Sequence, residues 1–347
     1  MLDAPSNPEF SMRVLNQLFT AAMVVLVASA ANAQTTTARV GIIPVLGVAP
    51  ILVVDREGWA KDAGFDLKFT TFESGPLMIQ ALASGTLDIY VAGVAPLGVA
   101  RSKGIDVRVV ASTAVEEMTV AAGPKLAPYF KDGVSGAQAL KDFRAATGKP
   151  ARLATQPPGS VPHTTLVHWL TESIKADKAD YEIVPMGIDA TQQALLAGAV
   201  DGGAIREPAD TIVQQRNPAI KIVALGGAMF DHQPGTVVAV SGAFLAKNPD
   251  SVQKLVNALV KADALIKSDP KRVAPYIEAA LGKGIVDVAT IEKALTSPAS
   301  KFVADPRVIV DATAKMQAFQ VSIGTLDKDV PLDGLFDASF YERATKK

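Results

Sequence analysis

The chain has 347 residues, of which 49% are hydrophobic and 20% charged, a composition typical of a globular protein with one large or two medium cores. Its formal net charge of -1, without a basic run or a cationic stripe interleaved with aromatics, excludes the usual electrostatic footprint of nucleic-acid binding. The lack of cysteine excludes disulfides, thiolate metal sites, cysteine nucleophiles and sulfur-linked lipid anchors.

The N-terminus carries the pattern of a secretory signal peptide. After Met12 a short basic start precedes an apolar stretch (18–31) and a small-x-small ending at 31–33. We expect cleavage after Ala33 and export to the periplasm, with residues 1–11 an upstream start or a cloning remnant. The alternative is a buried N-terminal helix. The apolar stretch is shorter than the ~20 residues of a membrane span, so we expect no membrane-embedded segment.

Strand and helix patterns alternate along the first part of the exported chain. The expected elements are strand 38–44, helix 47–63, strand 65–72, helix 74–84, strand 87–93, a short helix 96–103 and strand 106–112. Ser74 stands at a cap position and Pro76 in the first turn of its helix. Such alternation predicts an α/β fold with a mostly parallel sheet flanked by helices.

The pattern then recurs as a weak internal repeat. The segment 80–93 (QALASGTLDIYVAG) aligns with 193–206 (QALLAGAVDGGAIR), and Asp88 corresponds to Asp201. Around the second copy we expect strand 151–156, helix 164–174, strand 181–186, helix 207–215 and strand 221–226. Two α/β lobes of similar plan follow from this. The alternative is chance similarity between two Ala-rich helix–strand units.

Helical spacing dominates the C-terminal third. After a strand at 236–242, helices are expected at 249–268, 270–281, 287–295 and 306–324, and three of them begin with a proline that follows a polar cap residue. A chain that builds one lobe, crosses to a second and returns needs two crossing segments, for which 116–123 and 236–242 are the extended candidates. We therefore expect a two-strand hinge, with lobe I formed by 34–118 plus 240–347 and lobe II by 119–239.

Four stretches together resemble a known family. They are 74–93 (SGPLMIQALASGTLDIYVAG), 157–163 (PPGSVPH), 194–209 (ALLAGAVDGGAIREPA) and 243–263 (AFLAKNPDSVQKLVNALVKAD). The chain from Arg39 to about Ile323 resembles periplasmic substrate-binding proteins of ABC importers, in the group of sulfonate, taurine, nitrate and thiamine-pyrimidine-precursor binders. The resemblance implies a two-lobed, hinge-bending (type II) fold that closes on a small solute and delivers it to a membrane permease.

The loop from Thr155 to His163 is the first candidate site. Ligands of open α/β sheets bind outside the carboxyl ends of strands, where the first N–H groups of a helix lack intrahelical partners. Gly159 lets the backbone approach a ligand, and Ser160 offers a hydroxyl where the helix dipole favours an anion. Candidate ligand-binding residues here are Gly159, Ser160, Val161 and His163. The alternative is that Ser160 is an ordinary helix cap.

Other loops that join a strand end to a helix start extend this site. In lobe I these loops contribute Gly47, Val48, Ser74, Gly75, Gly93 and Val94. In lobe II they contribute Met186, Arg206 and Glu207.

Arg206 and Glu207 each allow two interpretations. A guanidinium at a strand end can hold a carboxylate or sulfonate with two parallel bonds, but Arg206 can equally form a salt bridge. Related sequences resemble WEP at this place, so Arg206 departs from the pattern. Glu207 can accept from an amine or amide of the solute, or it can compensate the N-terminus of a helix.

Residue types used in catalysis occur without a recognisable arrangement. His163 and His168 lie about 140° apart round one expected helix, so they cannot chelate one metal ion together. PGSVP is not a nucleophile elbow, and no nucleotide-binding glycine loop occurs. We expect no metal and no cofactor. A pyrimidine synthase resembles these binders, but its cysteine-rich signature is absent here.

The sequence therefore predicts a periplasmic solute-binding protein and not an enzyme. We expect a monomer that binds a small anionic organic solute, sulfonate- or carboxylate-like, and passes it to ABC permease subunits. The apolar rim and Glu207 leave room for a neutral or zwitterionic solute. The alternative is a secreted hydrolase or synthase that uses the same cleft.

Overall fold

The computed structural model describes residues 35–281 and 286–346. The chain divides into two units at Thr36, and the signal peptide expected at residues 1–33 lies outside the described residues. The architecture below is that of the unit from Thr37 onward. None of the helices in the described ranges combines the length and the apolar character needed to cross a membrane.

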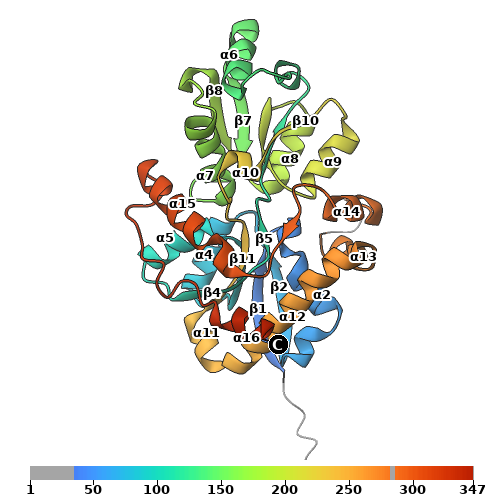
Figure 1. Ribbon diagram of the computed structural model, residues 1–347, viewed down its shortest axis with the longest axis vertical. Helices are drawn as coiled ribbons and strands as arrows, with labels where there is room; N and C mark the ends of the chain where they lie inside the picture. Colours follow the sequence, from blue (N-terminus) through green and yellow to red (C-terminus); the bar gives the residue numbers. More distant parts are fainter. Residues whose placement is uncertain (1–34, 282–285, 347) are drawn as a thin grey trace, which may run out of the picture. The chain divides into compact units, whose positions relative to one another are not determined.

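Two five-stranded sheets form this unit, which confirms the two expected α/β lobes (Figure 1). The first sheet has the order β2 (Phe65–Thr71), β1 (Thr36–Ile42), β3 (Ile89–Gly93), β11 (Thr236–Ser241) and β4 (Val107–Ser112). The second has the order β10 (Lys221–Leu225), β6 (Thr119–Ala122), β9 (Gly202–Ile205), β7 (Ala151–Thr155) and β8 (Tyr181–Pro185). A short ladder joins β5 (Ala114–Val115) to β12 (Lys301–Phe302).

Each sheet is mixed and contains one strand that runs against its neighbours. β11 is antiparallel to β3 and β4, and β6 is antiparallel to β9 and β10. The pairings β1–β3, β7–β8 and β7–β9 are parallel. The reversed strands are those by which the chain enters each sheet from the other lobe. One reversed strand in each sheet fits the expectation of mostly parallel sheets, but the expected crossing segment 236–242 is a strand of the first sheet and not a crossing.

The two crossing segments run side by side as a two-strand hinge. The amide of Thr113 donates to the carbonyl of Thr236 at 2.9 Å, and that of Glu116 donates to Gln233 at 2.8 Å. One expectation is wrong here. Residues 236–239 were expected in lobe II, but β11 pairs along its whole length with β3, and its apolar side chains are buried in the first sheet. The return crossing thus ends before Thr236.

Helices cover both sheets. On the first lobe they are α2 (Ala49–Arg56), α3 (Trp59–Asp62), α4 (Gly75–Ala83), α5 (Ala95–Ser102), α11 (Gly242–Lys247), α12 (Pro249–Ser268), α13 (Pro270–Leu281), α14 (Val288–Leu295) and α16 (Ser339–Thr345). On the second they are α6 (Gly136–Thr147), α7 (Val161–His168), α8 (Ile188–Leu196), α9 (Ala209–Arg216) and α10 (Gly226–Met229). Short turns of 3-10 or π helix occupy Leu46–Val48, Ala127–Tyr129, Trp169–Ser173, Lys178–Asp180 and Pro306–Ile309.

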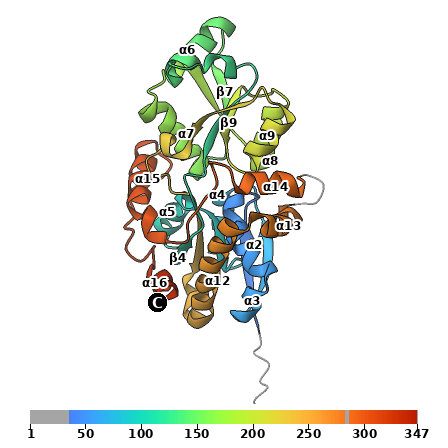
Figure 2. The ribbon, with the colours of Figure 1, turned by 45° about the vertical axis from the view of Figure 1, so that its right-hand side comes forward.

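Two C-terminal elements reach from the first lobe to the second. α15 (Val310–Ser322) contacts both α5 and α7, and α14 contacts α9 (Figure 2). The helix expected at 47–63 is broken, because Gly58 adopts φ 81° and separates α2 from α3.

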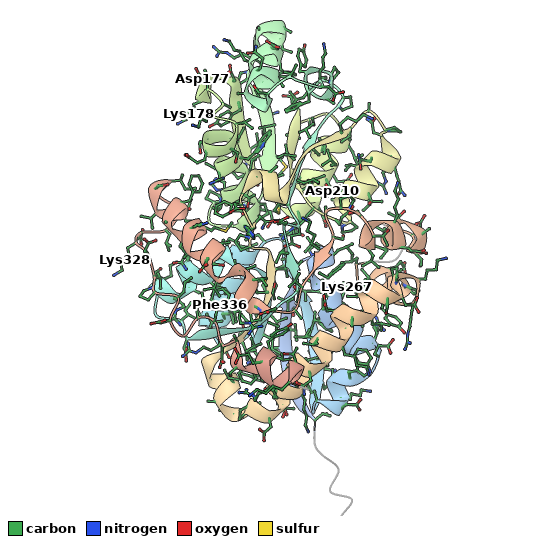
Figure 3. The ribbon with its side chains drawn as sticks, in the orientation of Figure 1. Asp177, Lys178, Asp210, Lys267, Lys328 and Phe336 are labelled. Atoms are coloured by element: carbon green, nitrogen blue, oxygen red, sulfur yellow. The ribbon has the colours of Figure 1, made fainter. Side chains whose placement is uncertain are left out.

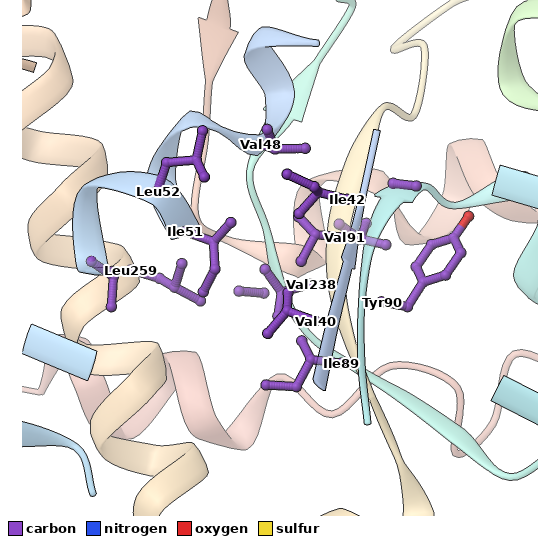
Figure 4. Packing of buried hydrophobic residues seen from close by; sticks show 14 of the residues in the cluster. Val40, Ile42, Val48, Ile51, Leu52, Ile89, Tyr90, Val91, Val238 and Leu259 are labelled. Atoms are coloured by element: carbon purple, nitrogen blue, oxygen red, sulfur yellow. The ribbon is translucent and has the colours of Figure 1, made fainter. Parts of the chain in front are cut away.

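The core of the first lobe shows why its strands are so apolar. Ile89 and Val91 of β3 face Ile51 of α2 and Leu259 of α12, whereas Tyr90 points to the opposite face (Figure 4). All five side chains are fully buried. A strand covered on both faces has no solvent side for polar residues, and each such aliphatic side chain contributes about 1.5–3 kcal/mol.

The internal repeat has a structural counterpart. Asp88 precedes β3 and its carboxylate accepts from the amide of Arg39 at 2.9 Å, in the middle of the neighbouring strand β1. Asp201 precedes β9 and its carboxylate accepts from the amide of Arg152 at 2.9 Å, at the start of β7. The two aspartates that align in sequence therefore fasten equivalent parallel strands in the two lobes.

Candidate functional site

Loops at the carboxyl ends of the strands bring the two lobes into contact. A Cβ atom added to Gly93 would lie 2.6 Å from Cγ2 of Val161, so the β3 loop touches the start of α7. A Cβ atom on Gly187, before α8, would lie 2.7 Å from the carboxylate of Glu73. The amide of Leu46 donates to the carbonyl of Glu207 at 2.8 Å. The expected loops from the two lobes do meet.

A small cavity of about 30 Å³ lies at this junction. Pro44 of the first lobe and Met118 of the hinge line one side of it. The second lobe contributes most of the wall, which includes Gln156, Pro162, Ile188, Asp189, Gln192 and Arg206. The volume has room for no more than a few water molecules. Of the candidate residues expected from the sequence, Arg206 alone is among those that line it.

Arg206 is held in a buried ion pair. Its Nη1 lies 2.8 Å from Oε1 of Glu117, and the two side chains are 4% and 5% exposed. The same Glu117 oxygen accepts from the hydroxyl of Thr236 at 2.7 Å. Glu117 belongs to the outward crossing segment, and Thr236 is the first residue of β11, directly after the return crossing, so the charge at the cleft is tied to the hinge. Within the described residues, Nε of Arg206 has no partner.

Further buried polar atoms near the strand ends also lack partners. In the part of the chain that the structure describes, they include Oγ of Ser74, Oγ1 of Thr155 and Oε1 of Gln156, from side chains at most 5% exposed. Leaving such a group without a hydrogen bond costs about 1–3 kcal/mol. Ser74 was expected to cap α4, but its hydroxyl makes no capping bond. A polar ligand bound between the lobes would supply hydrogen bonds to such atoms.

The loop before α7 is fixed by capping and by α15. Ser160 accepts from the amide of His163 at 3.3 Å, so it caps α7, the alternative that was left open for it. Gly159 has φ 82°, which favours glycine, and its carbonyl accepts from Nε2 of Gln320 on α15 at 3.4 Å. Burial lowers the pKa of His163, which keeps its ring neutral at pH 7.

Glu207 faces away from the small cavity. Its carboxylate accepts from the amide of Thr211 at 3.1 Å and from the Thr211 hydroxyl at 2.9 Å, at the start of α9. Burial is the main cause that raises the pKa of Glu207, and hydrogen bonds from Ser297 and Thr211 oppose it. Arg206 lines the small cavity, whereas Glu207, in the turn before α9, lines a different cavity. Of its two interpretations, the structure shows the helix-terminal one.

The remaining candidates pack within the protein. A Cβ on Gly47 would collide with the Thr236 hydroxyl of the hinge, and one on Gly75 would lie 2.6 Å from the Tyr90 hydroxyl. Val48 and Val94 are core residues, 0% and 1% exposed, and Met186 packs against the core of the second lobe. None of these residues is among those that line the small cavity.

Sequence reasoning missed several residues that line the cavity or control its charge. Gln156 stands inside the expected loop, directly before the two prolines, and its position after a strand was a usable signal. Gln192 follows from the spacing of α8, whose first turns contribute Asp189, Thr191 and Gln192 to the cavity wall. Glu117 is 89 residues from Arg206, and no local pattern connects the two.

Among residues 35–281 and 286–346, no group of three His, Asp or Glu side chains is arranged to hold a metal ion.

Comparison with known proteins agrees with this architecture. The chain is 26% identical over 244 residues to the nitrate import ATP-binding protein NrtC of Synechococcus elongatus, covering 70% of this chain and 37% of that longer protein. It is 24% identical over 326 residues to a putative aliphatic sulfonates-binding protein of Bacillus subtilis, covering 92% and 91%.

A solved structure with the same fold is the periplasmic nitrate-binding protein NrtA from Synechocystis PCC 6803. The TM-score is 0.74 at 13% identity, over 90% of this chain and 88% of that one. At this identity the likeness shows the fold, a two-lobed periplasmic-binding-protein fold. The model of the NMT1-like family matches residues 31–280, and this chain belongs to that family.

Proposed function

We propose that this chain is the periplasmic solute-binding protein of an ABC importer. It binds a small polar organic solute between its two lobes and delivers it to the permease subunits. One observation carries the proposal: Oε1 of Gln156 and Nε of Arg206, buried atoms without a hydrogen-bond partner among the described residues, belong to side chains that line the small cavity at the junction of the lobes. The names of the relatives, which refer to nitrate import and sulfonate binding, support it.

Binding of an organic solute requires the lobes to separate. The cavity of about 30 Å³ is smaller than such a molecule, and the loops around it touch at Gly93 and Val161. The lobes, divided near residues 118 and 235, open about the paired hinge segments. A solute that contacts both lobes then favours the closed state, because those contacts are lost on opening.

Arg206 gives the site its preference for an oxyanion. Its Nη1 remains with Glu117, and the edge of the guanidinium that carries Nε donates to a carboxylate, sulfonate or related group. Glu117 partly cancels the positive charge, so the remainder of the solute need not be anionic. The amide of Gln156, which lines the same cavity, supplies further hydrogen bonds.

A thermal-shift screen of the purified chain tests the proposal. The compounds are sulfonates, carboxylates, nitrate and pyrimidines, and a true ligand at 100 times its dissociation constant adds about 2.7 kcal/mol to the stability of the folded state. If none of the compounds in these classes stabilises the chain, the assignment to this solute class is contradicted.

Two variants then locate the site. Arg206→Lys keeps the charge beside Glu117 but loses Nε, and we expect at least a tenfold loss of affinity for the best hit. Gln138→Ala, on the exposed start of α6, is the control and should bind normally. Unchanged affinity in Arg206→Lys would remove Arg206 from the site.

Solute recovery separates a binder from an enzyme. We expect mass spectrometry to return the bound compound unchanged after prolonged incubation. Conversion of the compound would favour a secreted hydrolase or synthase.

A further inference from the structure

A second cavity lies on the other side of the β9–α9 junction. Its volume is about 420 Å³, and it shares none of its lining residues with the small cavity. One wall comes from the second lobe, with Thr119, Glu207 and Asp210, and the other from the segment 293–299 that ends α14 and follows it. Figure 3 shows Asp210 at the base of the second lobe.

Asp210 is the unusual residue of this cavity. Its side chain is 3% exposed, and its Oδ2 has no partner within the described residues. A buried carboxylate oxygen without a hydrogen bond is costly, and the protein tolerates it only if the group is protonated or if a ligand supplies a donor.

The hydrogen bonds of Thr119 indicate the protonation state of Asp210 when no ligand is bound. Its hydroxyl oxygen lies 2.6 Å from Oδ1 of Asp210 and 3.3 Å from the carbonyl oxygen of Ile205. A hydroxyl has one proton, so it can donate to only one of these two acceptors. If Asp210 is a neutral acid, it donates to Thr119, which in turn donates to Ile205. Burial, reinforced by the neighbouring Glu207, raises the pKa of Asp210 well above its usual range.

The rest of the lining is complementary to an amphiphilic cation. The ionisable residues among those that line the cavity are Glu207, Asp210 and Lys293. Lys293 forms the far wall and lowers the pKa of Glu207 slightly through its charge. Ile222 and Leu225 of β10 add an apolar surface, and Leu225 is 43% exposed at the rim. The cavity thus offers buried acid groups at one end and apolar contact at the other.

We propose that this cavity binds a small organic ammonium ion. The ammonium group donates to Oδ2 of Asp210 and approaches Glu207, while the alkyl part packs on Ile222 and Leu225. Binding ionises Asp210, and its proton goes to solvent, so one ammonium ion enters for each proton released. The proposal goes beyond solute capture in the cleft and does not depend on it.

Titration of the full chain with n-butylammonium chloride at pH 7 tests the proposal. Calorimetry should show saturable binding at one site, and a pH electrode in weakly buffered solution should record the release of up to one proton per chain. n-Butanol has the same alkyl part without charge and should not bind, and sodium chloride should release no protons. Equal binding of n-butanol, or no saturable binding of n-butylammonium, would overturn the proposal.

Two substitutions assign the binding to this cavity. Asp210→Asn preserves the shape of the side chain, and it should weaken n-butylammonium binding at least tenfold and abolish proton release. Lys293→Met removes the competing cation and should tighten binding severalfold, a gain that misfolding cannot produce. Lys254→Met, at an exposed position of α12, is the matched control and should bind as the unmodified chain does.

The test of ammonium binding does not depend on solute binding in the cleft between the lobes. Asp210→Asn should retain the thermal shift produced by the best cleft ligand, so loss of ammonium binding with an intact cleft supports the second site. Normal ammonium binding by Asp210→Asn would show that the ion binds elsewhere, and the inference would be wrong.

Discussion

The two sides of the β9–α9 junction bury charge in different ways. On the cleft side, Arg206 is paired with Glu117, and the pair is joined to the hinge through Thr236. On the opposite side, Asp210 has one hydroxyl partner and one oxygen without any in the described structure. On the cleft side, Arg206 and Glu117 stay charged because they form an ion pair. On the opposite side, Asp210 stays neutral because its carboxyl group holds a proton. A substitution should therefore be costly on the first side and pH-sensitive on the second.

Removal of Glu117 should give the largest loss of stability. Glu117→Ala leaves the guanidinium of Arg206 buried without its counter-ion and removes the acceptor of Thr236. Breaking a buried ion pair at one partner costs about 3–5 kcal/mol. Urea unfolding followed by circular dichroism measures the change in the free energy of unfolding.

An exposed ion pair supplies the control for Glu117. Glu182 lies 3.9 Å from Arg152, with side chains 55% and 48% exposed, so Glu182→Ala should cost less than about 1 kcal/mol. The double variant Glu117→Met/Arg206→Met should be more stable than Glu117→Ala, since no uncompensated charge remains. Equal losses for Glu117→Ala and Glu182→Ala would show that the buried pair has no special role.

A methyl group at the contact between the lobes should have the next largest effect. Gly93→Ala places a Cβ 2.6 Å from Cγ2 of Val161, a stiff β-branched side chain. Overpacking of this kind costs about 1–3 kcal/mol, or the lobes separate to relieve it. Small-angle X-ray scattering should give a larger radius of gyration for Gly93→Ala, together with weaker solute binding.

Shortening the partner should reverse that effect. Val161→Ala removes Cγ2, so the double variant Gly93→Ala/Val161→Ala should recover compactness, with a coupling energy of about 0.5–3 kcal/mol. Gly98→Ala is the control, because its Cβ would lie 3.3 Å from the flexible side chain of Gln317. If Val161→Ala brings no recovery, the two loops do not clash in the closed state.

Local signals predicted most of the fold. The helices expected at 249–268 and 270–281 coincide with α12 and α13, because a proline at the first position and a continuous apolar face define them. The single helix expected at 47–63 was wrong, because the left-handed backbone of Gly58 divides it into α2 and α3. The helical spacing of apolar residues continues across Gly58 and gave no sign of this break.

The site was harder to predict because its decisive contacts are between distant residues. The loop between β7 and α7 could be located from the sequence, since strand ends and helix starts are local features, and its role in binding stays a prediction. The pairing of Arg206 with Glu117 joins a strand end to a hinge segment, and the antiparallel register of β6 and β9, with Thr119 opposite Ile205, brings them together. The direction of Glu207 depends on the turn before α9, where its carboxylate accepts from the amide and hydroxyl of Thr211.

The acid on the far side of the junction should make stability depend on pH. The pKa of Asp210 is raised in the folded protein by burial and by Glu207, so the native state holds more protons than the unfolded state between the two pKa values. The stability that protonated Asp210 contributes is therefore fully present below the pKa of this group in the unfolded chain. It is lost as the pH rises through the pKa of Asp210 in the folded protein. The urea midpoint should fall from pH 5 to pH 8.

Removal of the ionisable group should flatten this dependence. Asp210→Asn cannot ionise, so its midpoint should change less over the same range and exceed that of the unmodified chain at pH 8. Some dependence should remain from Glu207, whose pKa is also raised by burial. Asp132→Asn, at an exposed turn, should keep the original slope. An unchanged slope in Asp210→Asn would mean that Asp210 is ionised throughout.

The smallest effect should come from the cap of α7, which borders the cleft. Ser160→Ala removes the acceptor of the His163 amide and should cost about 1 kcal/mol, as should Ser135→Ala, which removes the equivalent cap of α6 far from the cleft. Pro162, in the first turn of α7, lines the small cavity, so fraying at Ser160 should also weaken solute binding by about two- to fivefold. Ser135→Ala should leave affinity unchanged. Equal affinities for the two variants would restrict Ser160 to capping, and a loss far above fivefold would place its hydroxyl in direct contact with the solute.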